Sequence, residues 1–183
     1  MGIWRGVLCG CVLLGLSGPA WAAMKIESSD VAEGVQMNIA QIRAECRIRG
    51  KARGTNTSPA LAWSGAPAGT KSFAVTMIDP MEDKQPLWHW IVFDVPASVT
   101  ALPTGASGTA MPEGAIEGMN DHATKGYAGP CPPRGTTHRY IINVWALDVP
   151  SLSLTPEVTG PQLRPQLQLH SLDKATLTAR YEN

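Results

Sequence analysis

Three apolar segments with alternating side chains, residues 72–79, 87–95 and 139–147, constrain the fold more than any other feature of the sequence. Alternation with a period of two is the pattern of a β-strand. Residues 72–79 are apolar on both faces, which is typical of a strand inside a sheet that is covered on both sides. The chain also has 18 glycines and 15 prolines in 183 residues, which favours many short elements joined by turns. We therefore predict a mainly β domain with these segments at its centre.

The strand over residues 87–95 is expected to divide its side chains between two faces. Strict alternation places Leu87, His89, Ile91 and Phe93 on one face and Trp88, Trp90 and Val92 on the other. The remaining elements are expected to be a half-buried strand over 35–40, a basic loop over 43–57, an extended segment over 58–63, loops and short strands over 96–133, a helix beginning near Pro161 to Pro165, and a short strand over 177–181. Together they predict two packed antiparallel sheets with a peripheral C-terminal helix.

Residues 1–22 have the features of a secretory signal peptide. A short apolar run over 7–16 is followed by Ala20-Trp21-Ala22, which fits the small-x-small cleavage pattern, so we expect cleavage at its end or one residue later. A retained membrane anchor and a lipid anchor on Cys11 remain alternatives. We predict a periplasmic protein with one domain over residues 23–183 and no transmembrane segment in the mature chain.

Two cysteines, Cys46 and Cys131, lie outside that leader. An even number of cysteines in an oxidising compartment allows a disulfide. Two buried free thiols are the alternative, because sequence alone does not show that the two residues are close.

Three ionisable residues lie near the ends of predicted strands. Asp79 ends one strand, while His89 and His138 come at the start of the other two. Neighbouring strands would bring them to one rim of a sheet. Imidazoles can donate hydrogen bonds to an anion. An aspartate would repel an anion, so we expect Asp79 to accept a hydrogen bond from a histidine instead. The ordinary alternatives are a satisfied core histidine and a turn-forming aspartate.

The loop over residues 126–137 precedes His138 and is rich in glycine and proline. Prolines stiffen such a loop, and glycines let backbone N–H groups approach a ligand, which suits an anion. We assign no role to His122 or His170, which lie outside these strand ends.

In combination, these segments resemble the phosphatidylethanolamine-binding protein family, in its bacterial YbhB/YbcL branch, which is described as Raf-kinase-inhibitor-like. The resemblance covers roughly residues 35 to 182. Three short motifs carry it: Asn56-Thr57-Ser58-Pro59-Ala60-Leu61-Ala62-Trp63, Asp79-Pro80 and Trp88-His89-Trp90. The fourth motif is the stretch from Asn120 through Gly129-Pro130-Cys131-Pro132-Pro133 to Thr137-His138-Arg139-Tyr140.

The resemblance implies a large antiparallel sheet packed on a smaller one, with C-terminal helical structure. It also implies a pocket for phosphate, phosphorylated head groups or similar anions, and its residues match Asp79, His89, Gly129, Pro130, Pro132, Pro133, His138 and Tyr140. One departure is Met81, which stands where the family has a second acid; the adjacent Glu82 and Asp83 are candidates to replace it.

The leading hypothesis is a periplasmic binding or modulator protein without a cofactor, which takes a small anion and has a protein partner that it inhibits. A formal net charge of zero argues against nucleic acid as a partner. The first alternative is a hydrolase or metal enzyme that uses Asp79, His89 and His138, since two histidines and a carboxylate can bind a metal. The second alternative is a surface that binds proteins, with no function for the pocket.

Overall fold

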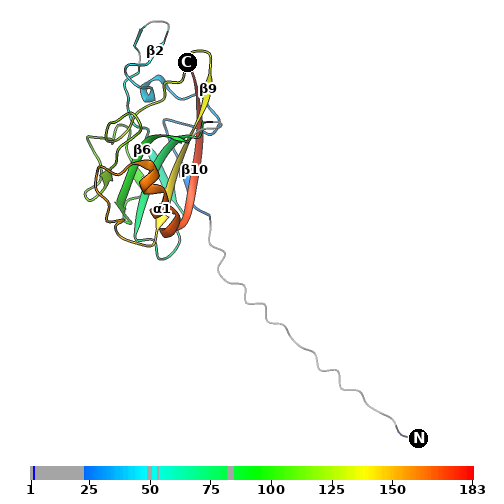
Figure 1. The fold of residues 1–183 in the computed structure, drawn as a ribbon. Helices are drawn as coiled ribbons and strands as arrows, with labels where there is room; N and C mark the ends of the chain where they lie inside the picture. Colours follow the sequence, from blue (N-terminus) through cyan, green and yellow to red (C-terminus); the bar gives the residue numbers. More distant parts are fainter. Residues whose placement is uncertain (1, 3–22, 49–50, 53, 82–84) are drawn as a thin grey trace.

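The computed structural model describes residues 2, 23–48, 51–52, 54–81 and 85–183. The signal peptide predicted over residues 1–22 lies outside the described residues, apart from residue 2. Twelve elements follow one another: β1 (Lys25–Glu27), the 3-10 helix η1 (Ile39–Gln41), β2 (Arg47–Ile48), β3 (Lys51–Ala52), β4 (Leu61–Ser64), β5 (Ser72–Asp79), β6 (Leu87–Pro96), β7 (Ala101–Leu102), β8 (Ile116–Glu117), β9 (Thr137–Leu147), α1 (Gly160–His170) and β10 (Ser171–Glu182). Figure 1 shows their arrangement.

The strands form a large sheet and a small one, as expected. The large sheet has five antiparallel strands in the order β10-β9-β5-β6-β8, and the small sheet has three in the order β1-β4-β7. The strands predicted over 72–79, 87–95 and 139–147 are β5, β6 and β9, adjacent in the large sheet. β5 lies at its centre, which explains why both its faces are apolar.

Two hydrophobic clusters cover the two faces of the large sheet. One lies on the face toward the small sheet and includes Trp63, Phe73, Met77 and Ile142. The other includes Phe93 and Leu163 and lies under α1, which crosses the opposite face (Figure 1). The fold therefore has three layers, which are the small sheet, the large sheet and α1, and the helix is peripheral as predicted.

Some minor elements differ from the sequence expectation. The strand predicted over 35–40 is wrong: Val35 and Ile39 are exposed, and the segment makes one isolated bridge before η1. The segment lies beside β10 for a single parallel bridge, in which the Arg180 N–H donates to the Val35 carbonyl at 3.0 Å and the Met37 N–H donates to the Arg180 carbonyl at 2.8 Å, so no extended strand forms. The loop expected over 43–57 contains the paired strands β2 and β3. The last strand is longer than predicted, since β10 pairs with β9 over nearly its whole length.

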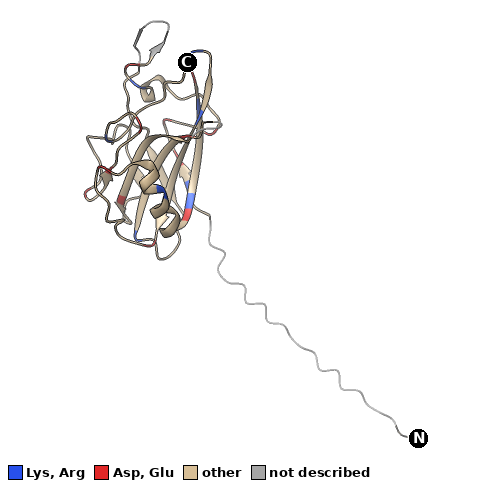
Figure 2. Ribbon diagram, viewed as in Figure 1, with Lys and Arg blue, Asp and Glu red and all other residues tan. Residues whose placement is uncertain are grey.

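Charged residues are distributed over several elements. Acidic and basic positions are interspersed along the described ribbon without a continuous basic stripe (Figure 2). Among the described residues, no helix is long and apolar enough to cross a membrane.

Candidate functional site

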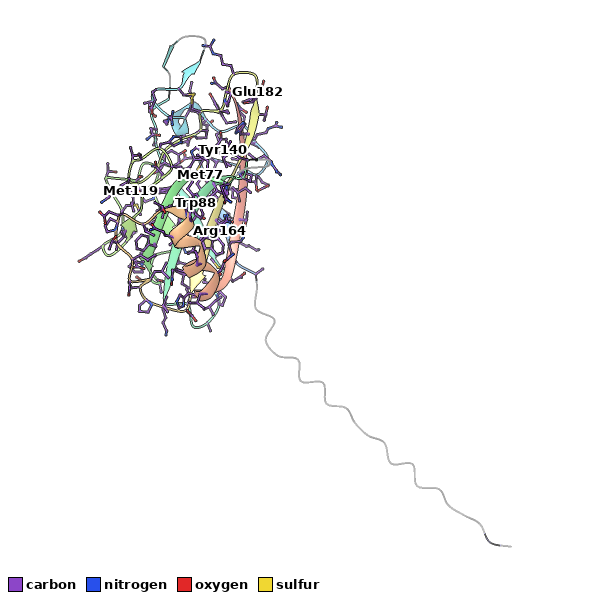
Figure 3. All side chains as sticks on the ribbon, viewed as in Figure 1. Met77, Trp88, Met119, Tyr140, Arg164 and Glu182 are labelled. Carbon is purple, nitrogen blue, oxygen red and sulfur yellow. A yellow bond between two sulfur atoms is a disulfide. The ribbon has the colours of Figure 1, made fainter. Side chains whose placement is uncertain are left out.

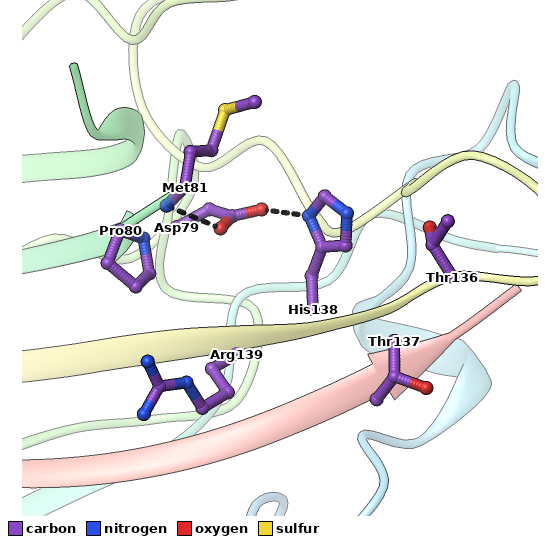
Figure 4. Close-up of a pocket in the computed structure, with 7 residues that line it drawn as sticks. All are labelled: Asp79, Pro80, Met81, Thr136, Thr137, His138 and Arg139. Atoms are coloured by element: carbon purple, nitrogen blue, oxygen red, sulfur yellow. Dashed lines mark hydrogen bonds and ion pairs between the residues drawn. The ribbon is translucent and has the colours of Figure 1, made fainter. Parts of the chain in front are cut away.

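Asp79 and His138 meet at one end of the large sheet. β5 ends at Asp79 and β9 begins one residue before His138, so antiparallel pairing brings the two positions together. The His138 Nδ1–H donates to Asp79 Oδ2 over 2.5 Å (Figure 4). Asp79 is only 5% exposed, and its carboxylate also accepts the backbone N–H of Met81 at 3.2 Å. The expected hydrogen bond from a histidine to Asp79 is therefore present, and His138 is the donor.

His89 reaches the same region through an irregularity in β6. The register pairs Met77 with Trp90 and Ile78 with Trp88, so His89 is an extra residue between two regular pairs. Such a β-bulge redirects a side chain and is frequent near functional sites.

The bulge overturns the predicted division of faces in β6. Trp88, not His89, joins Ile91 and Phe93 in the cluster beneath α1. His89 instead turns toward the opposite side of the sheet, where its ring packs edge-on against Tyr140 with 5.2 Å between centroids. Strict alternation was wrong here because one inserted residue shifts every preceding side chain to the other face.

The His89 ring is buried and neutral. Its Nδ1–H donates to the carbonyl oxygen of Ala128 at 2.7 Å, and the residue is 2% exposed. Burial lowers its pKa from 6.5 to about 4, assisted by His122 and Arg43 and only partly opposed by the Ala128 bond and the charge of Asp79. The other ring nitrogen, Nε2, is buried and has no hydrogen-bond partner in the part of the chain that the structure describes.

The proline-rich loop is held mainly through its own backbone. The Ala128 N–H donates to the carbonyl of His89 at 2.8 Å, and the Gly129 N–H donates to Asn56 Oδ1 at 2.7 Å. The expectation that N–H groups of this loop face a ligand therefore fails at these two positions, because protein acceptors already use them. A side chain at Gly129 would clash with the Gln41 carbonyl, so glycine is required there for close approach of two backbones.

A disulfide joins Cys46 and Cys131, with 5.4 Å between their Cα atoms. It fastens the proline-rich loop to the segment that carries Arg43, whose backbone N–H also donates to Pro130 at 3.3 Å. The disulfide was one of two alternatives left open by the sequence.

A cavity of about 120 Å³ lies between these elements. Its wall contains Asp79, Met81, Leu87, His89, His122, Cys131, Pro132, Pro133, His138 and Tyr140. Six predicted ligand-binding residues thus line one cavity, namely Asp79, His89, Pro132, Pro133, His138 and Tyr140, whereas Gly129 and Pro130 are buried and do not line it. We call it the inner cavity.

A second, larger cavity of about 360 Å³ lies outside the Asp79–His138 pair (Figure 4). It is lined by Asp79, Pro80, Met81, Thr136, Thr137, His138 and Arg139, and we call it the outer cavity. Asp79, Met81 and His138 belong to both walls, so the two cavities are adjacent. Glu82 and Asp83, the suggested replacements for the family's second acid, lie outside the described residues.

His122 is the site residue that sequence reasoning missed. Its ring lies 5.2 Å from that of His89, between centroids, and its Nδ1 is 2.6 Å from Nη1 of Arg43. The preceding Asn120 and Asp121 were the available signal, because such residues commonly organise tight loops through side-chain bonds to the backbone. Nothing in a sequence-only reading showed that this loop folds over the start of β6.

Tyr140 contributes a hydroxyl that keeps its proton. Burial raises its pKa, and the charge of Asp79 raises it further. Within the described chain, no three His, Cys, Asp or Glu side chains are placed to bind one metal ion. The only cysteine in the wall, Cys131, is oxidised in the disulfide.

Fold and site together define a β-sandwich with a small polar cavity at one end of its large sheet. A sequence profile described as phosphatidylethanolamine-binding protein matches residues 27–182. The chain therefore belongs to the phosphatidylethanolamine-binding protein family, a family of binding proteins.

Individual relatives agree with this assignment. The chain is 37% identical over 166 residues to the protein YbcL of Escherichia coli (strain K12), and the match covers 88% of each chain. It is 43% identical over 131 residues to YbhB of the same organism, covering 70% of this chain and 83% of YbhB. The crystal structure of E. coli YbcL, titled a new member of the mammalian PEBP family, gives a TM-score of 0.82 over 88% of this chain and 99% of that chain. A Mycobacterium tuberculosis relative named as a lipoprotein, LppC, is 34% identical over 134 residues, or 71% of this chain and 62% of LppC.

Proposed function

We propose that this protein is an exported, non-catalytic binding protein whose inner cavity takes a small oxyanion, such as phosphate or the phosphate of a larger molecule. The observation that carries the proposal is the inner cavity itself, which is small, enclosed by three histidines and a tyrosine, and adjacent to a larger outer cavity.

The size of the inner cavity favours a small ligand group. The cavity's volume of about 120 Å³ is well below the roughly 300–1,000 Å³ of sites for drug-sized ligands. A tetrahedral oxyanion fits this scale. The outer cavity, at about 360 Å³, would hold the remainder of a head group or of a phosphorylated side chain.

The chemistry of the wall also favours an oxyanion. Tyr140 keeps a hydroxyl proton that it can donate, and the imidazole of His138 has its Nδ1 committed to Asp79, so that Nε2 remains for a ligand. Asp79 thereby orients His138. The hydrogen bond that Asp79 accepts from His138 also reduces the repulsion between its carboxylate and a bound anion.

Catalysis has less support than binding. The described residues of the inner wall include no serine or free thiol as a nucleophile, and the carboxylate of Asp79 already accepts hydrogen bonds from His138 and Met81. A protein partner that the bound form inhibits remains part of the proposal, with the outer cavity beside Thr136 and Arg139 as the accessible surface.

The contacts at Met24 and β1 are compatible with cleavage at the predicted position. Met24 is buried, its N–H donates to Asp173 at 3.0 Å, and β1 starts at the next residue. Removal of residues 1–22 would leave these contacts intact. A relative named as a lipoprotein agrees with export within the family, and a lipid anchor on Cys11 is the variant of the proposal that it favours.

Phosphate titration with thermal unfolding tests the binding proposal. Phosphate at a hundred times its Kd should stabilise the wild type by about 2.7 kcal/mol, since stabilisation follows RT ln(1 + [L]/Kd). The His138→Ala variant should gain far less, because a donor to the anion is lost.

The matched control is His170→Ala, which removes a histidine that bonds Asp148 at 2.9 Å, outside both cavities. Its phosphate response should equal that of the wild type. No stabilisation of the wild type by phosphate, or by a phosphorylated head group such as phosphoethanolamine, would rule out the oxyanion site; equal shifts in wild type and His138→Ala would remove His138 from it.

A further inference from the structure

Two imidazole nitrogens on residues that line the inner cavity are buried and have no hydrogen-bond partner among the described residues. They are Nε2 of His89 and Nε2 of His122, whose rings lie 5.2 Å apart between centroids. Buried polar atoms in native proteins are almost always hydrogen-bonded, so an exception needs an explanation, and a missing ligand is one. The partner of each ring's other nitrogen decides whether Nε2 donates or accepts.

The His89 ring presents an acceptor. A carbonyl oxygen only accepts, so the bond with Ala128 requires the hydrogen of His89 on Nδ1. Because burial keeps the ring neutral by lowering its pKa to about 4, Nε2 carries a lone pair.

The His122 ring presents a donor. An arginine guanidinium only donates, so Nδ1 of His122 must accept from Nη1 of Arg43, at 2.6 Å. The hydrogen of the neutral ring is then on Nε2. A protonated ring would place two donors face to face, and both burial and the charge of Arg43 lower the pKa of His122. The two neighbouring histidines therefore have opposite tautomers.

The position of His122 is fixed by bonds on either side. The carboxamide of Asn120 accepts the N–H of His122 at 2.9 Å and donates to the carbonyl of Gly126 at 2.9 Å. Asp121 is fastened to β6 at Trp88, since Asp121 Oδ2 accepts the Trp88 N–H at 2.7 Å and its own N–H donates to the Trp88 carbonyl at 2.9 Å. His122 is thus held beside His89, one residue beyond Trp88.

We propose that His122 is a specificity-determining residue, and that the acceptor of His89 and the donor of His122 together select an oxyacid group that retains a proton, such as a phosphate or phosphate monoester, over fully ionised sulfate. The inference rests on the proposed oxyanion site. One P–OH would donate to His89 Nε2 while a P–O⁻ accepts from His122 Nε2–H. Sulfate has no hydrogen to give, so it would place an oxygen lone pair against the lone pair of His89.

Affinity should therefore follow the protonation of the ligand. The second pKa of a phosphate monoester is about 6, so the singly charged form that can donate becomes scarcer by up to tenfold for each pH unit above that value. Other groups around the two rings also respond to pH or carry charge: Asp79 on β5, His138 and Tyr140 on β9, Asp121 beside His122, and Arg43 and Glu45 on the disulfide-linked segment. Any gain of positive charge or loss of negative charge around the two rings at lower pH would strengthen sulfate binding as well, so sulfate controls for these groups.

Calorimetric titration of the full protein with a phosphate monoester such as phosphoethanolamine, with inorganic phosphate and with sulfate, at pH 5.5, 6.5 and 7.5, tests the selection. The affinity for the monoester, relative to that for sulfate, should fall as the pH rises, whereas inorganic phosphate keeps at least one hydrogen throughout this range. We expect phosphate to bind at least tenfold more tightly than sulfate at pH 6.5. The His122→Phe variant keeps a planar ring but loses the donor, and should bind phosphate about tenfold more weakly. His170→Phe is the matched control and should bind both anions like the wild type.

Two outcomes would overturn the selection but not the oxyanion site itself. One is equal affinity of the wild type for phosphate and sulfate. The other is an unchanged phosphate affinity in His122→Phe together with an unchanged melting temperature. Binding of neither anion would overturn the proposed function. NMR of the imidazole nitrogens in ligand-free protein tests the tautomers separately, and should find hydrogen on Nδ1 of His89 and on Nε2 of His122. The reverse pattern would contradict the inference even if phosphate binds.

Discussion

The large sheet borders a cavity on each face, and the two cavities differ in a way that separates a candidate site from ordinary packing. Beneath α1, a groove of about 410 Å³ runs past Trp88 and Trp145. On the opposite side, the inner cavity has only about 120 Å³. By volume, the groove is the more obvious place for a ligand.

The polar groups of the groove are nevertheless satisfied. Trp145 Nε1 donates to Thr76 at 3.1 Å, and Thr176 donates to Asn143 at 2.8 Å. None of the residues that line the groove, all of them described, has a buried side-chain nitrogen or oxygen without a partner.

Cations cover both tryptophan rings of the groove. Arg164 lies 5.8 Å from the ring centre of Trp88, and Lys174 lies 4.7 Å from that of Trp145. Figure 3 shows Arg164 on α1 beside Trp88, with Tyr140 farther along the sheet. The wall of the inner cavity, by contrast, contains two buried nitrogens for which the described residues provide no partner. Unsatisfied polar atoms, more than volume, indicate where a ligand belongs.

The largest predicted effect concerns the disulfide, which borders the inner cavity and not the groove. Replacing Cys46 and Cys131 with alanine should destabilise the protein by about 4 kcal/mol, because the bridge closes a loop across a sequence separation of 85 residues. Phosphate stabilisation should also fall, since the segment carrying Arg43 is released. Urea unfolding with and without phosphate measures both effects.

The same protein provides the control for this prediction. The decrease in unfolding free energy caused by Arg164→Ala should be the same in the protein with the disulfide and in the variant without it, because the groove lies on the other face of the sheet. Mass spectrometry of the unreduced protein should show a linked Cys46–Cys131 peptide and, if the protein is exported as proposed, an N-terminus just after residue 22. Two alkylatable thiols, or an intact leader, would contradict the bridge or the export proposal respectively.

The second effect is a loss of stability in mild acid that comes from His89. The pKa of His89 is about 4 in the folded protein, compared with the ordinary value of 6.5 that applies to the unfolded chain. As the pH falls, the unfolded chain therefore binds this proton at a higher pH than the folded protein does. The stability due to neutral His89 is complete above pH 6.5 and is lost between pH 6.5 and 4, by about 3 kcal/mol. The lowered pKa of His122 acts in the same direction.

Urea unfolding at pH 7 and at pH 4.5 measures this effect. His89→Phe should lower stability at pH 7, because it removes the bond to Ala128, yet it should flatten the dependence on pH. The groove has no histidine in its wall and should not contribute. An equally steep dependence in the variant would mean that other groups titrate in this range.

The smallest effect belongs to the groove. Arg164→Met keeps the aliphatic contact but removes the charge above Trp88, and should cost about 0.5–1 kcal/mol of stability. Phosphate stabilisation should remain as in the wild type. A large loss of phosphate binding in Arg164→Met, with none in His138→Ala, would reverse the assignment of the two cavities.

Sequence reasoning found most of the site because strand ends are visible in a sequence. Asp79 and His138 follow from the limits of two apolar runs, and pairing of those runs brings the two residues together. The direction of His89 could not be predicted, because a bulge depends on which residues of the neighbouring strand pair with it. His122 was missed because its loop has no periodicity, and only its bonds to Trp88 bring it to the cavity.

The sequence by itself determined the central strands, the helix near the C-terminus and the residue types of the site, because hydrophobic periodicity and proline placement act locally along the chain. Only the tertiary structure decided which side of the sheet His89 faces, that Arg43 and His122 are partners, and that the backbone N–H groups of Ala128 and Gly129 are used within the protein. These features depend on contacts between segments distant in sequence, and hydrogen-bond partners of that kind fix both the tautomers of the two histidines and the chemistry that the inner cavity can offer.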